Sequence, residues 1–142
     1  MDWVYLLNSF HGRIGRQTFW IAMSAVVVAN VAACYLAEKI DGERLSAIVD
    51  VAFTYPQFAI AAKRGHDCGL PVWVLGIFFA VNAVLDLLVV LGLAGTNQEP
   101  SAILLTLELP FMVVLIALLI ELGCRKGPAG PNQYGPDPLG KS

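Results

Sequence analysis

Charged residues are scarce in this chain of 142 residues. Lys, Arg, Asp and Glu together make up 14% of it, against about 25% in ordinary soluble domains. Hydrophobic residues make up 57%. A chain of this composition cannot cover its folded surface with polar groups, so the balance predicts a protein whose solvent is largely the membrane.

Cysteine is also rare, and its three copies show no disulfide or zinc spacing. Cys34, Cys68 and Cys124 are an odd number without a C-x-x-C pair. An acid, Asp2, stands where a signal peptide would carry its cationic region, and no small-residue cleavage site follows a short apolar core. We therefore expect the first hydrophobic span to be retained, and we expect no cofactor.

The residue patterns of common enzymes are missing as well. Neither histidine, His11 or His66, stands in a Ser-His-Asp or Cys-His arrangement that can be read from sequence. The chain contains no phosphate-binding glycine loop of the Walker type. The two histidines could in principle join Cys68 and Cys124 in a tetrahedral zinc site, but these residues come from separate segments without recognisable spacing. We assign no catalytic residue and no metal ligand, and expect a protein that is not an enzyme.

What the chain does contain is long apolar stretches. Crossing about 30 Å of hydrocarbon as a helix takes about 20 mostly apolar residues, and spans are expected at about 19–37, 46–62, 72–93 and 102–123. The second is the weakest, because it contains Asp50 and Pro56, and a re-entrant or protein-buried segment is the alternative. The fold class predicted is an all-α membrane protein, with a bundle of four transmembrane helices in residues 1–126.

Two shorter segments flank the spans. Before the first span, Trp3, Leu6, Leu7 and Phe10 recur at helical spacing, which predicts a short helix at about 2–10 lying in the membrane interface. After the last span, residues 127–142 are dense in Pro and Gly, which cannot continue a helix. We expect an irregular, cytoplasmic C-terminal tail.

The basic residues are distributed unevenly about these spans. Only Lys39 and Arg44 fall on one side. Cytoplasmic loops of membrane proteins carry the excess of Lys and Arg, so the other side, with both termini, is expected to be cytoplasmic. It holds the remaining seven of the nine basic residues, Arg13, Arg16, Lys63, Arg64, Arg125, Lys126 and Lys141.

Three motifs lie at this basic side. They are Gly12-Arg13-Ile14-Gly15-Arg16 before Phe19-Trp20, Lys63-Arg64-Gly65-His66-Asp67, and Asn132-Gln133-Tyr134-Gly135-Pro136-Asp137-Pro138. In order and spacing they resemble the DUF805 family of small bacterial inner-membrane proteins of unknown function, from about Trp3 to Leu139. The entry to the third span departs from that family, with Leu70-Pro71-Val72-Trp73 in place of its usual Ser-Gly-Trp-Trp. The resemblance implies location and architecture and names no substrate.

The polar residues of these motifs form the first candidate site. If they converge, they make a basic pocket in which guanidinium groups hold the phosphate of an anionic lipid, or a partner protein. Simple electrostatic anchoring of the helix ends is one alternative. In another, His66 and Asp67 tie the loop to Arg13 or Arg16 as an internal staple. The residues are Arg13, Arg16, Lys63, Arg64, His66, Asp67 and Asn132.

Acids inside the spans form the second candidate site. Asp86 and Glu108 are expected at one level of the bundle, with Asp50 nearby and Asn82 one turn from Asp86. An ionisable group at membrane depth is costly and usually faces a partner or water. One interpretation is a proton- or cation-coupled transporter or channel. In the other, the acids are protonated or hydrogen-bonded to Asn82 and Thr106 and only fix helix packing.

Partner expectations follow from the same features. Membrane lipids, including anionic head groups, are expected, and no nucleic acid. Ala25, Ala29 and Ala33 repeat every fourth residue and leave a smooth strip on the first span. We expect packing within the chain to bury this strip; a seam for a homo-oligomer or a partner membrane protein is the alternative.

Overall fold

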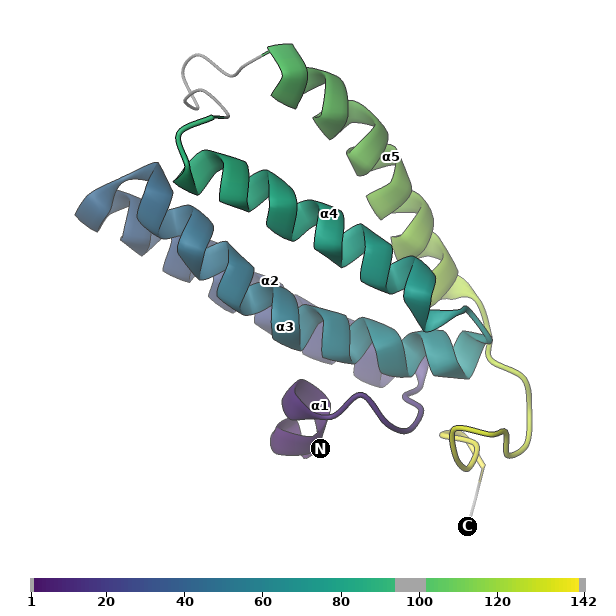
Figure 1. Ribbon diagram of the computed structural model, residues 1–142. Helices are drawn as coiled ribbons and strands as arrows, with labels where there is room; N and C mark the ends of the chain where they lie inside the picture. The colour runs from purple at the N-terminus through teal and green to yellow at the C-terminus, as the bar shows by residue number, and fades with distance from the viewer. Residues whose placement is uncertain (1, 94–101, 141–142) are drawn as a thin grey trace.

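The architecture is entirely helical. The computed structural model describes residues 2–93 and 102–140, apart from the side chains at 102–105 and 108. Within these residues there is no strand, only an isolated bridge between Asn132 and Gly135. The all-α prediction is confirmed by five helices, α1 (Trp3–Asn8), α2 (Arg16–Asp41), α3 (Glu43–Cys68), α4 (Val72–Val90) and α5 (Ala102–Cys124), shown in Figure 1.

Three of the helices, α2, α3 and α4, are long and apolar enough to cross a membrane. Their 26, 26 and 19 residues correspond to about 39, 39 and 29 Å at 1.5 Å per residue. In α5 the apolar stretch found among the described residues, Leu109–Cys124, is shorter than a span. The helices are consistent with a membrane protein, and the count of four crossings stays a prediction.

The weak second span is an unbroken helix. α3 continues through Pro56, and it extends to Cys68, six residues beyond the apolar stretch expected to end at 62. It is the central helix of the bundle, since it contacts α1, α2, α4 and α5.

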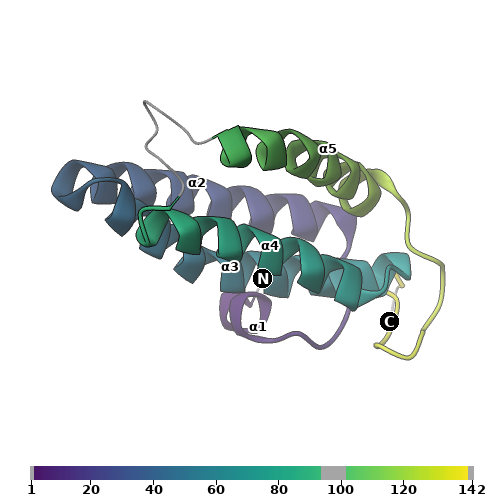
Figure 2. The same cartoon turned by 45° about the horizontal axis from the view of Figure 1, so that its top comes forward.

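The helices return through very short turns. A single residue, Gly42, joins α2 to α3 with φ +74° and ψ -162°, a positive-φ conformation that glycine adopts without steric cost. We call this the hairpin end of the bundle. At the other end, Gly69, also at φ +74°, ends α3, and Pro71 precedes α4. Figures 1 and 2 show α2, α3 and α4 packed side by side.

The tightly packed core lies at what we call the basic end, where α2 and α4 begin and α3 and α5 end. Phe19, Ile60 and Leu75 are fully buried there, with Leu6 of α1 and Leu122 of α5. Towards the hairpin end α5 leans away from α4, as Figure 1 shows. The bundle is therefore tightly packed at the basic end and more open towards the hairpin end.

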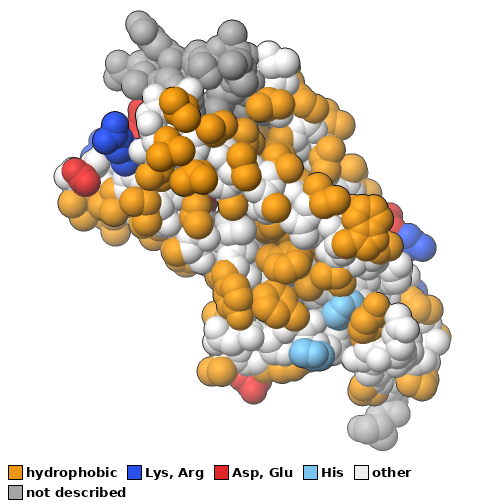
Figure 3. All heavy atoms as spheres, viewed as in Figure 1, with side chains coloured by type: hydrophobic (Ala, Val, Ile, Leu, Met, Phe, Trp, Pro, Cys, Tyr) orange, Lys and Arg blue, Asp and Glu red, His pale blue; other side chains and the backbone are white. Residues whose placement is uncertain are grey.

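The surface has an apolar middle and charged ends. Large hydrophobic side chains such as Val28, Trp73 and Val113 are exposed on the long helices. On the face that Figure 3 shows, hydrophobic side chains cover much of the helices, and Lys, Arg, Asp and Glu gather at the ends. Helices that are hydrophobic all round are typical of membrane spans.

The alanine strip of α2 is not buried within the chain. Ala25 and Ala29 are exposed and Ala33 is half-buried, whereas the buried residues of α2 are Phe19, Ala22, Val26, Asn30 and Ala37. The prediction that packing within the chain buries this strip is therefore wrong. The contact face of α2 is displaced by one residue around the helix and includes the polar Asn30.

The N-terminal helix is shorter than expected and packs against α3. Its side chain Leu6 is 2% exposed, while Trp3 remains 43% exposed. Phe10 lies beyond the helix and contacts the rings of Tyr55 and Phe58 at centroid distances of 5.3 and 5.4 Å. The helix is present; its position in the membrane interface stays a prediction.

Candidate functional site

Asp67, near the end of α3, lies between two buried guanidinium groups. Its Oδ1 accepts from Arg13 Nε at 3.0 Å and lies 2.9 Å from Arg13 Nη2, and its Oδ2 pairs with Arg64 Nη1. Arg13, Arg64 and Asp67 are 8%, 0% and 4% exposed. Buried charges require partners, and these three residues supply them to one another. We call them the arginine clamp.

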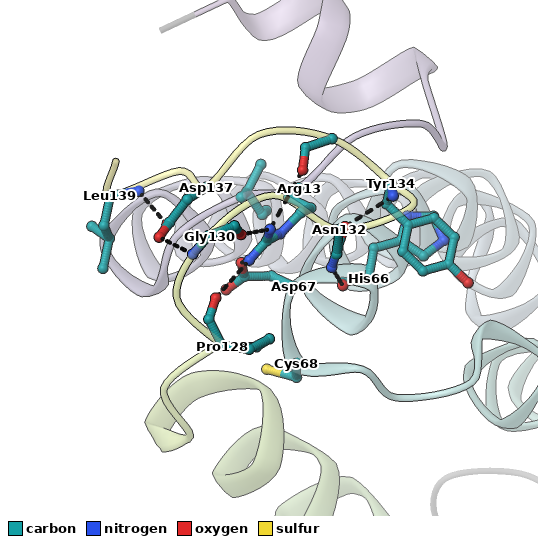
Figure 4. A network of polar contacts seen from close by, with 12 residues as sticks. Arg13, His66, Asp67, Cys68, Pro128, Gly130, Asn132, Tyr134, Asp137 and Leu139 are labelled. Carbon is teal, nitrogen blue, oxygen red and sulfur yellow. Dashed lines mark hydrogen bonds and ion pairs between the residues drawn. The ribbon is translucent and has the colours of Figure 1, made fainter. Parts of the chain in front are cut away.

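The rest of the Arg13 guanidinium holds the C-terminal tail. Nη1 donates to the carbonyl oxygens of Gly130 at 2.8 Å and Gly135 at 3.4 Å, and Nη2 donates to that of Pro128 at 3.1 Å. Figure 4 shows the tail wrapped around this side chain. A Cβ at Gly127, where the tail begins, would lie 2.5 Å from Asp67 Oδ2, so the close approach requires glycine there.

Arg64 holds the end of α5 in the same way. Its Nε donates to the carbonyl of Leu122 at 2.6 Å, Nη2 donates to that of Arg125, and Nη1 reaches that of Ile14 at 3.4 Å. The last carbonyls of a helix have no partner within it, and a cation there is also favoured by the helix dipole. One buried side chain thus caps α5 and ties it to the N-terminal loop.

His66 and Asn132 complete the contact between α3 and the tail. Asn132 Nδ2 donates to the carbonyl of His66 at 3.1 Å, and the Tyr134 ring stacks on the His66 ring at 3.8 Å between centroids. The Nδ1 of His66 lies 3.1 Å from the Gly12 carbonyl oxygen. A carbonyl only accepts, so this contact requires the proton to be on Nδ1.

The tail has its own fold, closed by Asp137. The carboxyl accepts from the backbone N–H of Gly130 and of Leu139, both at 2.9 Å. These two hydrogen bonds, with that from Gly130 the stronger influence, hold the pKa of Asp137 below its ordinary value of 3.8. A carboxylate is therefore the structural state of Asp137 at neutral pH.

Lys63 faces inward and docks α1. Its Nζ donates to the carbonyl of Leu6 at 2.7 Å, lies 4.9 Å from the centre of the Tyr5 ring, and the residue is fully buried. Arg16, in contrast, is exposed and donates to the carbonyl of Cys124 at 3.4 Å.

The seven residues expected at the basic end are thus not one open basic pocket. Arg13, Arg64, Asp67, His66 and Asn132 form a single network, Lys63 joins it through α1, and Arg16 lies outside it. The geometry is that of the internal staple, with Asp67 bound to Arg13. The sequence did not reveal Arg64 as the second partner of Asp67, because adjacent cations in a motif do not indicate which one turns inward.

A second polar group lies between α2, α3 and α4. Asn30 Nδ2 donates to Asp50 Oδ1 at 2.6 Å, and Asn82 Nδ2 donates to Asp86 Oδ2 at 2.9 Å and approaches Asp50 Oδ2 at 3.5 Å. We call these four residues the Asp50 cluster. Glu108, expected at the level of Asp86, has a side chain outside the described residues. Asn30 was missed, although a lone amide in an apolar span is a detectable signal.

Two adjoining cavities meet at this cluster. One, of about 460 Å³, extends to the hairpin end and is lined by the carboxyl-bearing residues Glu38, Glu43, Asp50 and Asp86. The other, of about 370 Å³, extends towards the basic end between all four long helices and is lined mainly by Phe and Leu. Asn30, Val31 and Asp50 line both. We call them the acidic cavity and the apolar cavity.

Comparison with known proteins identifies the relatives of this chain. The model of a family described as "Protein of unknown function (DUF805)" matches residues 7–136. The chain belongs to the DUF805 family. It is also 30% identical over 135 residues to the uncharacterized protein YiiR of Escherichia coli strain K12, covering 92% of this chain and 86% of YiiR, with the same values for YiiR of strain O157:H7. No solved structure matches.

In this DUF805 chain the three motifs of the resemblance meet in one network. The first supplies Arg13, the second Arg64 and Asp67, and the third Asn132 and the carbonyl of Gly135. In this member of the family, the segments that carry the three DUF805 motifs are therefore the segments that the arginine clamp holds together.

Proposed function

We propose that this protein is a multi-pass, non-enzymatic protein of the bacterial inner membrane that binds anionic lipid head groups at its basic end, with that end and both termini cytoplasmic. The observation that carries the proposal is how the cations are divided. Arg13, Lys63 and Arg64 make internal contacts, whereas other cations at the same end are exposed.

Three exposed cations surround the junction of α2 and α5. Arg16 stands at the start of α2 and bonds to the end of α5, where Arg125 and Lys126 follow. Arg125 is paired with Glu121 through exposed side chains, a kind of contact that stabilises little. Arg16 and Lys126 therefore carry most of the proposed binding.

An aromatic residue supports this position as the level of the lipid head groups. Trp20, one turn into α2, donates its indole N–H to the carbonyl of Gly123 at 3.2 Å. Tryptophan is enriched at the membrane interface, where its ring is apolar and its N–H is satisfied. A phosphate beside Arg16 would then lie at the boundary just outside the apolar part of α2.

The test is retention of lipid by the full chain. Each Lys or Arg near an anionic surface is worth about 1 kcal/mol, so Arg16→Gln with Lys126→Gln should weaken binding by about 2 kcal/mol, or roughly 30-fold. Native mass spectrometry of protein extracted with its lipids, and titration with phosphatidylglycerol in nanodiscs, would measure this.

A matched control lies at the opposite end of the bundle. Lys39→Gln with Arg44→Gln removes the same charge and should leave phosphatidylglycerol binding unchanged. Equal losses in the two double variants, or none in either, would rule out a specific site at the basic end. Loss of a co-purifying protein with lipid binding intact would instead assign this surface to a protein partner.

A second candidate function is a small proton- or cation-coupled transporter or channel, acting as a homo-oligomer. Its support is that Asp50 and Asp86, from different helices, meet at Asn82 beside a cavity. Asp86→Asn should abolish pH-dependent flux in proteoliposomes, while Glu121→Gln, at the basic end, should not. Wild-type protein without flux under proton, sodium and potassium gradients would end this proposal.

A further inference from the structure

The two cavities adjoin, because Asn30, Val31 and Asp50 line both, and the chemistry of the walls changes from one cavity to the next. On α2 the apolar cavity is lined from Phe19 to Val31, about 18 Å along the helix axis, and the acidic cavity follows from Asn30 to Glu38. Such a space, apolar at one end and polar at the other, fits a molecule with one chain and one head group.

The apolar cavity has the walls and size of a ligand site. Its volume of about 370 Å³ lies within the roughly 300–1,000 Å³ of small-molecule pockets. The lining includes Met23, Phe78, Phe111, Leu115 and Leu118, and it exists because α5 packs on α2 and α3 but leans away from α4. Apolar voids do not hold water well, so an apolar chain is the occupant that such walls favour.

The acidic cavity determines the charge of the head group. Among the residues that the structure describes, its lining includes four that bear a carboxyl group and no Lys or Arg. Among the described residues, no ion pair reaches Asp50 or Asp86. The amides of Asn30 and Asn82 donate to them, and the two acid side chains also lie within hydrogen-bonding distance of each other. A carboxylate can accept about four hydrogen bonds, so both acids retain capacity for a further donor.

The nearby cations are directed elsewhere. Lys39 Nζ lies over the Tyr35 ring at 5.4 Å. Arg44 Nη2 lies beside Gly92, 3.5 Å from the position of a Cβ there. Neither residue lines the cavity, and charge complementarity therefore favours a cationic donor from outside the chain.

We propose that the two adjoining cavities bind one single-chain amphiphile with a protonated amine head, its chain in the apolar cavity and its ammonium group beside Asp50 and Asp86. A zwitterionic phospholipid fits less well, since its phosphate would enter a space lined with carboxyls. Binding of this amphiphile is independent of the anionic-lipid site at the other end and of whether the ligand crosses the membrane.

The experiment compares head groups on one chain length. Dodecylamine, dodecanol, dodecanoate and lysophosphatidylethanolamine would be titrated into the full chain in nanodiscs, with bound ligand measured by native mass spectrometry. Since hydrogen bonds to charged groups are the stronger ones, we expect dodecylamine to bind at least about tenfold tighter than dodecanol. This comparison uses the wild-type protein and does not depend on a variant folding.

Variants then locate the site. Asp50→Asn with Asp86→Asn, isosteric changes, should remove the preference for the amine while dodecanol binding is kept. Leu118→Trp should fill the apolar cavity and weaken both ligands. Arg16→Gln with Lys126→Gln should change neither, which separates this site from the proposed anionic-lipid site. Equal binding of amine and alcohol, preference for dodecanoate or the phospholipid, or no binding by wild type would overturn the proposal.

Discussion

Replacing Asp67 by Asn tests the arginine clamp directly. The substitution keeps the size of the side chain but leaves the guanidinium groups of Arg13 and Arg64 buried without a counter-charge. Removing one partner of a buried ion pair typically costs about 3–5 kcal/mol. Asn still offers one acceptor oxygen, so we expect a loss near 3 kcal/mol in the free energy of unfolding, against a total of about 5–15 kcal/mol for ordinary domains.

Unfolding in mixed detergent and SDS micelles, followed by circular dichroism, would measure this loss. Glu121→Gln is the matched control, because it removes a carboxylate from an exposed pair at the same end of the molecule and should change stability little. Limited proteolysis provides a second measurement. Release of Arg13 should free the tail, so cleavage after Lys126 should accelerate in Asp67→Asn and not in the control.

Gly127→Ala tests the same site without changing a charge. Its Cβ would lie 2.5 Å from Asp67 Oδ2 and 2.7 Å from the Asp67 carbonyl oxygen, so the tail must move away. We expect faster cleavage of the tail with the helices intact. If Asp67→Asn were no more destabilising than Glu121→Gln, and the tail stayed protected in both clamp variants, the clamp would not be what holds this end together.

Two further predictions concern packing and pH. Gly123→Ala should destabilise the protein by about 1–3 kcal/mol and shift Trp20 fluorescence, because its Cβ would lie 2.3 Å from the indole. The control is Gly76→Ala, whose Cβ would have its nearest contact at 4.0 Å and which should be neutral or stabilising by up to about 1 kcal/mol. Equal effects of the two substitutions on stability would contradict the packing argument. The lowered pKa of Asp137 means that this side chain stabilises the tail fully above pH 3.8. The stabilisation is lost as the pH falls through the pKa of Asp137 in the folded state, which is lower. Hydrogen exchange of the Gly130 amide should lose protection only in that acidic range, and loss already near neutral pH would contradict it.

Much of the fold could be read from composition and spacing. The apolar stretches predicted α2, α3 and α4, because the free energy of transferring a helix into an apolar environment is the sum of the contributions of its neighbouring residues. Helix ends were less accurate, and α3 extends to Cys68 because Lys63 and Arg64 find partners that allow a charged helical turn to be buried. The exposed strip at Ala25 was misjudged, since small size does not reveal which face another helix occupies.

The sequence by itself determined the membrane-type composition, the helical class, the uneven placement of cations and the DUF805 motifs. Only the tertiary structure decided that Arg13 and Arg64 turn inward while Arg16 stays outside, and that Asn30 joins Asp50. The physical reason is that the partners of a buried arginine are largely backbone carbonyls. Pro128 and Gly130 lie 115 and 117 residues away from Arg13 in the chain, and a carbonyl carries no side-chain identity that a sequence could display.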